Sequence, residues 1–250
     1  VIVDEASAAL PIHVYTALTK GRVGASLIGD FEQNGPITNT KAAALAPGVR
    51  RWLHDDPFKL VGISNLESAQ ATPGCVALRD QYRFGPVTTA LANRVAYKGL
   101  LQEASWAPPH SDTDPEVILI DTSCLGEAAR SEDGPNGKGR WWAAGAALSY
   151  QLAQRHGFAG VGVVSPYRLQ AQLTQTRLRE AGGGATQVGT AHAFQGREFH
   201  TVILDLVEDG SGSSWVAQAR RNGSQWALDG VRLFNVAVTR NAHRLYIITN

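Results

Sequence analysis

Short runs of β-branched and other apolar residues alternate along this chain with stretches in which apolar residues recur at helical spacing. The alternation is typical of an α/β protein with a mostly parallel sheet. The predicted strands are Val1–Val3, Ala25–Ile28, Val117–Ile120, Gly160–Val164, Val188–Gly189, Thr201–Leu206 and Leu245–Ile248. The predicted helices are Pro86–Tyr97, Arg140–His156, Leu169–Ala181 and Arg232–Thr239.

Segments rich in glycine, proline and small polar residues separate these elements. A domain boundary is predicted near Ser68–Gly74, where Ala-Gln-Ala-Thr-Pro-Gly interrupts the periodicity. Ser131–Gly139 is predicted to be a loop, and Asp209–Asp229 a long surface excursion.

Composition describes an ordinary globular protein. The chain has 250 residues, enough for one large or two small domains, with 44% hydrophobic and 18% charged residues. It contains no apolar run long enough to span a bilayer and no signal peptide, so no membrane partner is predicted. Cys75 and Cys124 lie too far apart in sequence to suggest a metal-binding pair or a disulfide framework, and the cytoplasm is therefore the expected compartment.

Charge and chain ends add two further expectations. The net charge of +1 does not by itself indicate a nucleic-acid-binding protein, although a local basic track would suffice for one. The chain has no methionine, it opens in the apolar run Val1–Val3, and it closes at the edge of another apolar run. Both ends therefore look cut, and we expect the chain to be a portion of a longer protein.

Two polar motifs follow apolar strands in the first part of the chain. Asp4 and Glu5 come directly after Val1–Val3, at the strand end where α/β sheets place ligand chemistry. In a nucleotide hydrolase, the first acid would hold Mg²⁺ through water and the second would polarise the attacking water. Gln33, in Gly-Asp-x-x-Gln, could hold a γ-phosphate or that water by its amide. The alternative for both motifs is a solvated turn.

Two arginine motifs occur later in the chain. Arg83, in Gln-Tyr-Arg, and Arg240, in Asn-Val-Ala-Val-Thr-Arg, could each stabilise charge on a transferring phosphoryl group. Tyr82 offers a flat face on which a base could stack. Ordinary solvated arginines are the competing interpretation.

The most specific signal is Thr190-Ala-His192-Ala-Phe-Gln195-Gly196-Arg197-Glu198. It gathers a hydroxyl, an imidazole, an amide, a permissive glycine and a carboxylate into one compact loop. A lone His192 would more often be structural than functional, but the combination favours a site.

Taken in order, these motifs, together with Ser-Pro-Tyr-x-x-Gln, resemble those of superfamily 1 nucleic-acid helicases. The branch that they resemble includes the nonsense-mediated-decay helicase and its bacterial relatives. The resemblance runs from Val3–Ala6 to Asn235–Arg240. It implies a RecA-like P-loop NTPase fold, with residues 1–68 ending the first RecA-like domain and residues 69–250 forming a complete second one.

The resemblance also implies a role for each motif residue. ATP and Mg²⁺ would be used, with Asp4 holding Mg²⁺ through water and Glu5 acting as catalytic base. Gln33 would sense the γ-phosphate and couple the domains, and Arg83 and Arg240 would be arginine fingers. The residues expected at the nucleotide are Tyr82, beside the adenine, Gly196, and Glu198, against the ribose or the phosphates. The residues expected to face single-stranded DNA or RNA are Ser165, Tyr167, Thr190 and His192.

The sequence departs from the family pattern in three places. A Gly-rich Walker A loop ending Gly-Lys-Ser/Thr occurs nowhere in the chain, so the resemblance implies that it belongs before Val1 and that this chain alone is inactive. The usual Leu-Pro-Pro after Gln33 is replaced by Asn34-Gly35-Pro36, and Asn241 follows Arg240 in place of alanine. Neither replacement removes a charged residue.

Two other interpretations remain. The whole protein could be a translocase that never separates strands, which a strand-displacement assay would distinguish. The chain could also be an inactive module that binds nucleic acid or a partner. Retention of Glu5, Arg83 and Arg240 argues against that module.

Overall fold

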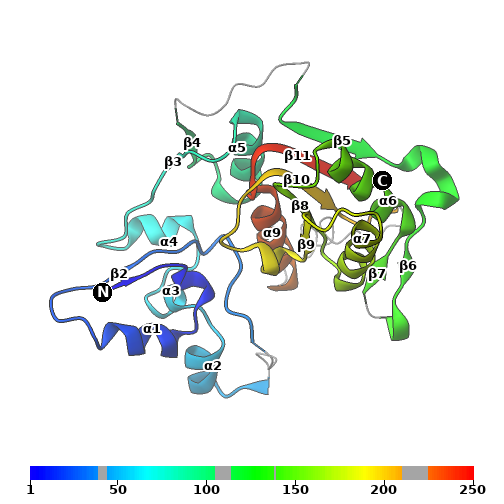
Figure 1. Cartoon of the computed structure of the whole chain (residues 1–250). Helices are drawn as coiled ribbons and strands as arrows, with labels where there is room; N and C mark the ends of the chain where they lie inside the picture. The colour runs from blue at the N-terminus through cyan, green and yellow to red at the C-terminus, as the bar shows by residue number, and fades with distance from the viewer. Residues whose placement is uncertain (39–43, 105–113, 138, 210–224) are drawn as a thin grey trace. The chain divides into compact units, whose positions relative to one another are not determined.

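The computed structural model divides the chain into two compact units, Val1–Leu78 and Arg79–Asn250 (Figure 1). It describes residues 1–38, 44–104, 114–137, 139–209 and 225–250. Most of the predicted Asp209–Asp229 excursion lies outside these residues.

The first unit is a small parallel strand pair with short helices. β1 (Ile2–Val3) and β2 (Ser26–Leu27) pair in parallel, with Val3 opposite Leu27. The helices are η1 (Ala6–Ala8), α1 (Pro11–Leu18), α2 (Pro47–Leu53), α3 (Pro57–Leu60) and α4 (Leu66–Ala71). The Asn65 side chain and Ser68 form a capping box at the start of α4, so the boundary predicted near Ser68 begins inside a capped helix. The division into units comes later, after Leu78.

The second unit is built on a five-stranded parallel sheet. Its strands lie in the order β5 (Val117–Asp121), β11 (Asn241–Thr249), β10 (Phe199–Asp205), β8 (Val161–Val164) and β9 (Gln187–Gly189). All neighbouring strands run parallel. The predicted strands are present with slightly different ends, and the predicted α/β class with a parallel sheet is confirmed.

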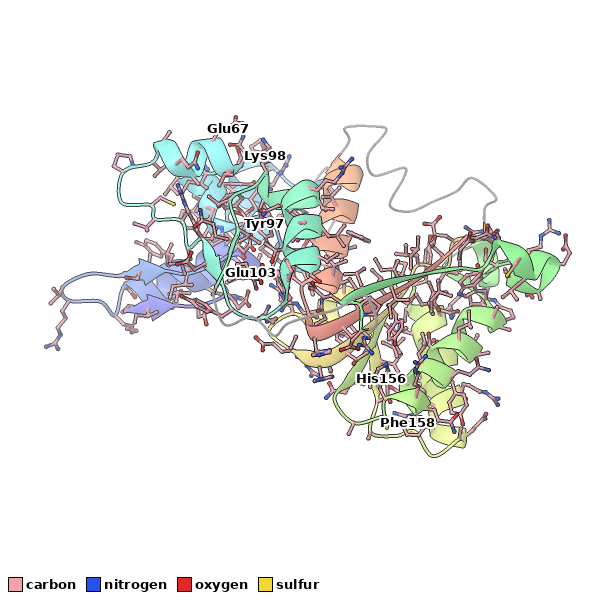
Figure 2. All side chains as sticks on the ribbon, turned by 90° about the horizontal axis from the view of Figure 1, so that it is seen from above. Glu67, Tyr97, Lys98, Glu103, His156 and Phe158 are labelled. Atoms are coloured by element: carbon pink, nitrogen blue, oxygen red, sulfur yellow. The ribbon has the colours of Figure 1, made fainter. Side chains whose placement is uncertain are left out.

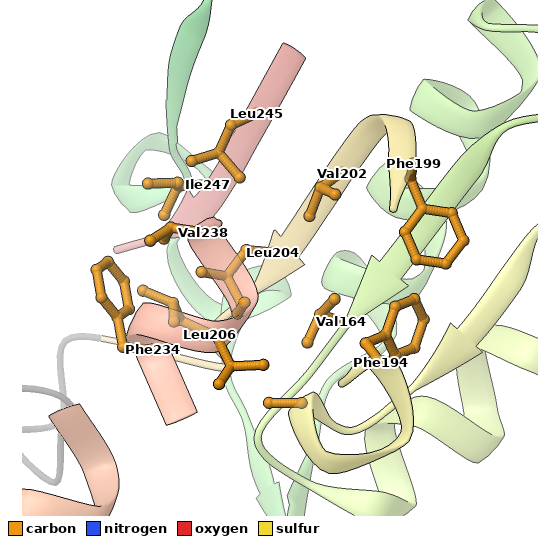
Figure 3. Packing of buried hydrophobic residues seen from close by; sticks show 13 residues of the cluster. Val164, Phe194, Phe199, Val202, Leu204, Leu206, Phe234, Val238, Leu245 and Ile247 are labelled. Carbon is orange, nitrogen blue, oxygen red and sulfur yellow. The ribbon is translucent and has the colours of Figure 1, made fainter. Parts of the chain in front are cut away.

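Helices cover both faces of this sheet. α9 (Gln225–Val238) packs on one face over a cluster that includes Val202, Leu204 and Leu245 (Figure 3). α6 (Ala143–Arg155) and α7 (Arg168–Glu180) contribute to a second cluster, around Val163 and Ile203. Because successive strand residues point to opposite faces, each central strand supplies both clusters, which explains its continuous apolar sequence.

The segment before β5 packs beside α9. α5 (Pro86–Ala92) continues into the π-helix η3 (Asn93–Tyr97), so the helix predicted over Pro86–Tyr97 is helical throughout. The hydroxyl of Tyr97, labelled in Figure 2, accepts a hydrogen bond of 2.9 Å from Asn235 Nδ2 of α9. A short parallel pair, β3 (Asp80–Gln81) with β4 (Gln102–Glu103), flanks these helices in sequence.

Two sequence predictions about local structure were wrong. The segment predicted as the loop Ser131–Gly139 contains β6 (Glu132–Asp133) and the short helix η5 (Pro135–Gly137). β6 pairs with β7 (Arg140–Trp141), so the first residues of the helix predicted over Arg140–His156 form a hairpin strand instead. Two-residue strands have too short a pattern to register as periodicity.

Two short helices complete the described elements of the second unit. η4 (Ser123–Ala129) follows β5, and η6 (Ala191–Phe194) follows β9. Over the residues that the structure describes, no helix has both the length and the apolar character needed to cross a membrane.

Candidate functional site

In the first unit, the carboxylates of Asp4 and Glu5 stand at the end of β1. Both residues are exposed, and Asp4 Oδ1 accepts a hydrogen bond of 2.9 Å from the backbone N–H of Glu5. Glu5 adopts a left-handed backbone conformation, with φ of 51°, which is uncommon for a residue other than glycine. This turn ends β1 and starts η1 while leaving both side chains in solvent.

Gln33 lies in the turn that follows β2. Its Nε2 donates to Asp30 Oδ2 at 2.9 Å, and Asp30 Oδ1 accepts from the N–H of Glu32 at 2.9 Å. The backbone N–H of Asp30 donates in turn to the hydroxyl of Ser7, which is only 1% exposed. Sequence reasoning chose Gln33 but missed Ser7 and the role of Asp30 in orienting the amide.

Gly29 brings this turn against η1. A Cβ at Gly29 would lie 2.8 Å from the backbone nitrogen of Ser7 and 2.9 Å from a ring carbon of Phe58. The N–H of Ala6 donates to Ile28 O at 2.8 Å in the same region. The ends of β1 and β2 therefore meet, and they hold the motifs of Asp4, Glu5 and Gln33 on neighbouring turns.

In the second unit, the side chain of Gln81 organises the turn that carries Tyr82 and Arg83. Its Nε2 donates to Phe84 O at 2.7 Å and to Thr89 Oγ1 at 2.8 Å. Its Oε1 accepts from the backbone N–H groups of Arg83 and Phe84, both at 3.1 Å. Every hydrogen-bonding atom of the amide is used, so the turn is fixed to α5.

Arg83 contacts two other motifs. Its NH1 donates to the carbonyl of Thr239 at 3.0 Å, and its NH2 forms an ion pair with the Glu198 carboxylate. The side chains of Arg83 and Glu198 are 30% and 56% exposed, so this pair remains open to solvent. Tyr82 is half exposed beside it. The structure thus brings together residues predicted from three distant stretches of sequence.

Arg240 is buried, so the competing interpretation of an ordinary solvated arginine is wrong at this position. It is 3% exposed, and its Nε donates to Val236 O at 3.0 Å. Its NH2 donates to Thr239 Oγ1 at 3.3 Å, and its NH1 reaches the carbonyl of Arg197 at 3.5 Å. Isolated arginines are mostly exposed in proteins, so sequence alone gave no sign that carbonyls of α9 and of the segment before β10 would enclose this one.

These residues share the amino-terminal edge of the sheet. Glu198 directly precedes β10 and Arg240 directly precedes β11, and the N–H of Phe199 donates to Arg240 O at 3.0 Å. Gly196, with φ of 73°, supplies a left-handed turn just before Glu198. Adjacent strand starts therefore place the two motifs side by side.

The carboxyl-terminal edge carries a different set of residues. Ser165 and Tyr167 follow β8, and Thr190 and His192 follow β9, so the residues predicted to face nucleic acid share one edge. Ser165 is buried, and its hydroxyl accepts the N–H of Tyr167 at 3.4 Å. Burial of Tyr167 raises the pKa of its phenol.

A cavity of about 210 Å³ opens at this edge. Its polar lining includes Ser165, Thr190 and His192, together with Arg168 at the start of α7. Apolar residues complete the lining, among them Leu233 of α9. His192 is exposed and Thr190 is partly buried, so both can meet a ligand lying across the edge.

The stretch Thr190–Glu198 connects the two edges. Phe194, in η6, packs its ring 4.9 Å from that of Phe199 (Figure 3). A Cβ on Gly189 would lie 2.8 Å from the Phe194 ring, and one on Gly162 would lie 2.8 Å from the Phe199 ring. These glycines let the aromatic pair lie directly against the strands, so one short segment crosses the sheet and contributes to both edges.

Glu116 is a further residue that sequence reasoning missed. Its carboxylate is 1% exposed and accepts from the N–H groups of Val87 at 2.8 Å and Thr88 at 3.1 Å. A negative charge at the start of α5 is favourable because the first N–H groups of a helix lack partners. Glu116 is far in sequence from Val87 and Thr88, so no local motif predicts this helix cap.

Comparison with known proteins finds a matching domain family and relatives that are ATP-dependent helicases. Residues 63–250 match the model of an AAA domain family, AAA_12. The DNA replication ATP-dependent helicase/nuclease DNA2 of Xenopus laevis is 25% identical over 259 residues, covering 89% of this chain and 22% of that protein. The ATP-dependent helicase upf1 of Schizosaccharomyces pombe is 25% identical over 271 residues, covering 100% of this chain and 26% of that protein.

The crystal structure of Arterivirus nonstructural protein 10, a helicase, aligns over 99% of this chain and 38% of that chain, with a TM-score of 0.45 and 19% identity. The chain therefore spans about a quarter of the two curated relatives and a little over a third of this solved chain.

Proposed function

This chain belongs to the AAA domain family AAA_12, within the superfamily 1 helicases related to the nonsense-mediated-decay helicase, and we propose that it forms the carboxyl-terminal part of an ATP-driven motor acting on single-stranded nucleic acid. Residues 1–68 would then end a first RecA-like domain, and residues 69–250 would form a second one. ATP hydrolysis would power translocation along the strand.

The convergence of Arg83, Glu198 and Thr239-Arg240 on one sheet edge carries this proposal. Arg83 contacts both other motifs, and its Nε is buried without an acceptor among the described residues. A buried donor of this kind needs an acceptor, which water or a ligand can supply. A phosphate oxygen is a suitable acceptor because a guanidinium binds phosphate through several N–H groups at once.

Binding of the nucleoside part of ATP to Glu198 would change the contacts of Arg83. Its carboxylate accepts from Arg83 in this structure and is more than half exposed. Ribose hydroxyls that donate to Glu198 would compete with the ion pair and free the guanidinium to meet charge on the γ-phosphate. Tyr82, half exposed beside the pair, would flank the base.

The first unit offers the complementary carboxylates. Mg²⁺ commonly uses one or two carboxylates and completes its shell with water and substrate phosphates, and the exposed pair Asp4 and Glu5 suits that requirement. Asp4 would hold the ion through water, and Glu5 would take a proton from the attacking water. Bound Mg²⁺ neutralises phosphate charge. Gln33, oriented by Asp30, would hold the attacking water or the γ-phosphate.

The loop that binds the triphosphate would lie elsewhere in the whole protein. We propose a Walker A loop on the amino-terminal side of Val1, because the family places this loop upstream of the Asp-Glu strand and no such motif occurs within Val1–Asn250. The cytoplasm is the proposed compartment, on the basis of cysteine usage; Cys75 and Cys124 are free thiols.

Single-stranded DNA or RNA would lie along the opposite edge. Thr190 and His192 would contact the backbone, together with Tyr167, while Ser165 would act through the turn that its hydroxyl holds. Contacts of this kind bind with little sequence preference. Whether the motor also separates strands is tested by strand displacement.

The decisive assay uses the full-length protein. We expect ATP turnover that rises on addition of a single-stranded oligonucleotide, whereas the isolated chain Val1–Asn250 turns over negligibly because it lacks the phosphate-binding loop. Full-length protein that binds neither ATP nor oligonucleotide would contradict the proposal. Robust turnover by the isolated chain would require a different phosphate site.

A further inference from the structure

A fully buried carboxylate ends β10. Asp205 is 0% exposed, and its Oδ1 accepts from the indole Nε1 of Trp142 at 2.7 Å and from the N–H of Val207 at 3.1 Å. Its Oδ2 accepts from Gln170 Nε2 at 2.6 Å. Burial raises the pKa of Asp205 to about 6, with these hydrogen bonds opposing the rise, so the carboxylate form predominates at pH 8.

Gln170 fixes which groups of this network donate hydrogen bonds and which accept them. While its Nε2 donates to Asp205, its Oε1 accepts from the backbone N–H of Trp142 at 2.9 Å. Turning the amide over would set Nε2 against that N–H and Oε1 against the carboxylate, which breaks both bonds. Gln170 and Trp142 are 0% exposed, so water cannot replace a lost partner.

The start of α6 is shaped around this network. A Cβ on Gly145 would overlap the indole of Trp142 and lie 2.5 Å from Asp205 Oδ2. Trp142 is the N-cap residue of α6, so its two bonds hold that helix start against β10 and α7. We name Asp205, Trp142 and Gln170 the carboxylate clamp.

The clamp ends next to the loop assigned to nucleic acid. Gln170 lies in the first turn of α7, which begins at Arg168 directly after Ser165–Tyr167. β10 also neighbours β8 in the sheet, with Leu204 opposite Val164, so Asp205 lies at the level of Ser165. Holding Gln170 therefore fixes the helix start from which this loop departs.

We propose that Asp205 is a positioning residue for nucleic-acid binding: through Gln170 and Trp142 it holds the Ser165–Arg168 loop in the conformation that contacts the strand. The inference rests on the proposed function. A clamp that served only the stability of the fold would change unfolding without selectively changing oligonucleotide affinity, and this difference makes the two roles separable.

The test reverses the polarity of the clamp in the full-length protein. In Asp205→Asn, the new amide N–H₂ faces the N–H₂ of Gln170. In Gln170→Glu, two carboxylates face each other, which disfavours ionisation of both. In the double variant, the amide oxygen at position 205 can accept from Trp142 and Val207, and the amide nitrogen can donate to the carboxylate at position 170. That carboxylate can still accept from the N–H of Trp142, so all partners are satisfied again.

Affinity for a fluorescent oligothymidine and a fluorescent oligouridine is measured at pH 8 and fixed salt, alongside the KM for ATP. Asp205→Asn should weaken oligonucleotide binding by about tenfold, the equivalent of one hydrogen bond to a charged group, with KM within about twofold of wild type. The double variant should return to within about twofold of wild-type affinity, as expected for directly coupled residues.

Two further variants guard against simple unfolding. Trp142→Phe removes the indole donor and part of the ring volume but keeps the backbone N–H that donates to Gln170, and it should weaken binding less than Asp205→Asn does. Glu116→Gln changes another buried carboxylate of the same sheet, at the other edge, and should lower the melting temperature while leaving oligonucleotide affinity unchanged.

A folded double variant that stays weak, or a Glu116→Gln variant that loses the same affinity, overturns the positioning role. Single variants that lose affinity and raise KM in parallel also overturn it. If wild-type protein binds neither oligonucleotide, the proposed function fails as well, and that outcome is seen before any variant is compared.

Discussion

The two edges of the five-stranded sheet in Arg79–Asn250 are built differently. At the amino-terminal edge, Arg83 and Glu198 form a partly exposed ion pair. At the carboxyl-terminal edge, Asp205 is fully enclosed and bound by neutral donors. Exposed ion pairs contribute about 0–1 kcal/mol, so their members exchange partners easily. Breaking a buried network leaves unsatisfied groups and costs far more.

This difference matches the two proposed tasks. A group that meets phosphate during turnover must leave one partner for another, which a solvent-open pair permits. A loop that holds a strand backbone must keep its shape while the nucleotide changes, which a closed network ensures. The segment Thr190–Glu198 contributes to both edges, and the ring of Phe194 within it packs against that of Phe199.

The largest effect is expected from Arg83→Ala in the full-length protein. If Arg83 stabilises the transferring phosphoryl group as proposed, its loss should lower turnover by about a thousandfold or more, or about 4 kcal/mol of barrier. Stability should fall by about 1 kcal/mol or less, because the ion pair is open to solvent. Steady-state ATP hydrolysis and thermal melting measure both. Arg79→Ala, an exposed arginine of the same segment, should change neither. Near-normal turnover by Arg83→Ala would refute the assignment.

Arg240→Ala should combine a similar loss of turnover with a clear loss of stability. Its removal leaves the carbonyls of Val236 and Arg197 without their donor and opens a cavity at a site only 3% exposed. We expect a cost of about 2–4 kcal/mol, and a melting temperature lower by about 5–10 °C.

Arg240→Lys separates the two contributions, because lysine keeps the charge but lacks the planar fork. It should recover part of the stability and little of the turnover. Full recovery of turnover with lysine would show that charge alone is needed at this position.

A smaller effect is expected at the carboxyl-terminal edge. Thr190→Val and His192→Ala should each weaken oligonucleotide binding by about fivefold, or about 1 kcal/mol, with little dependence on base sequence and with ATP binding retained. Binding is compared at one moderate salt concentration. His200→Ala, an exposed imidazole near the amino-terminal edge, is the matched control and should bind like wild type. Unchanged binding in both variants would make Thr190 and His192 structural residues.

The last expected effect is on stability alone, as a pH dependence that Asp205 introduces. Its pKa in the folded protein is about 6, above the ordinary 3.8, so between about pH 4 and 6 the folded state keeps a proton that the unfolded state has released. The contribution of Asp205 to stability should therefore fall as pH rises through this window and stay constant above it. Urea unfolding of wild type and Asp205→Asn across pH 4–8 tests this. A difference between the two proteins that does not vary with pH would contradict it.

The sequence predicted the parallel sheet because buried parallel strands contain continuous apolar runs, such as Val202–Leu204. It missed the hairpin of β6 and β7 because each strand has two residues and is defined only by its partner. The start of α9 was placed at Arg232, whereas the helix begins at Gln225. The stretch before Gln225 is rich in glycine and serine, which favour a loop, so the sequence pattern predicted a later helix start.

For the candidate site, sequence identified the residues with recognisable chemistry, and the structure brings Arg83 and Glu198 into contact. The contacts that hold these residues in place were not predictable. Gln81 and Gln170 stand in the motifs Gln-Tyr-Arg and Ser-Pro-Tyr-x-x-Gln, but their contacts with Thr89 and Asp205 follow only from the fold. Glu116 and Asp205 belong to neither motif, and they bind groups that are distant in sequence.

Hydrogen–deuterium exchange of the full-length protein tests most directly whether the two edges serve different ligands. A non-hydrolysable ATP analogue alone should protect backbone amides in Gln81–Phe84 and Gly196–Glu198. A single-stranded oligonucleotide alone should protect Ser165–Arg168 and Thr190–His192. Protection of the same segments by both ligands, or the reverse assignment of the two edges, would contradict the account.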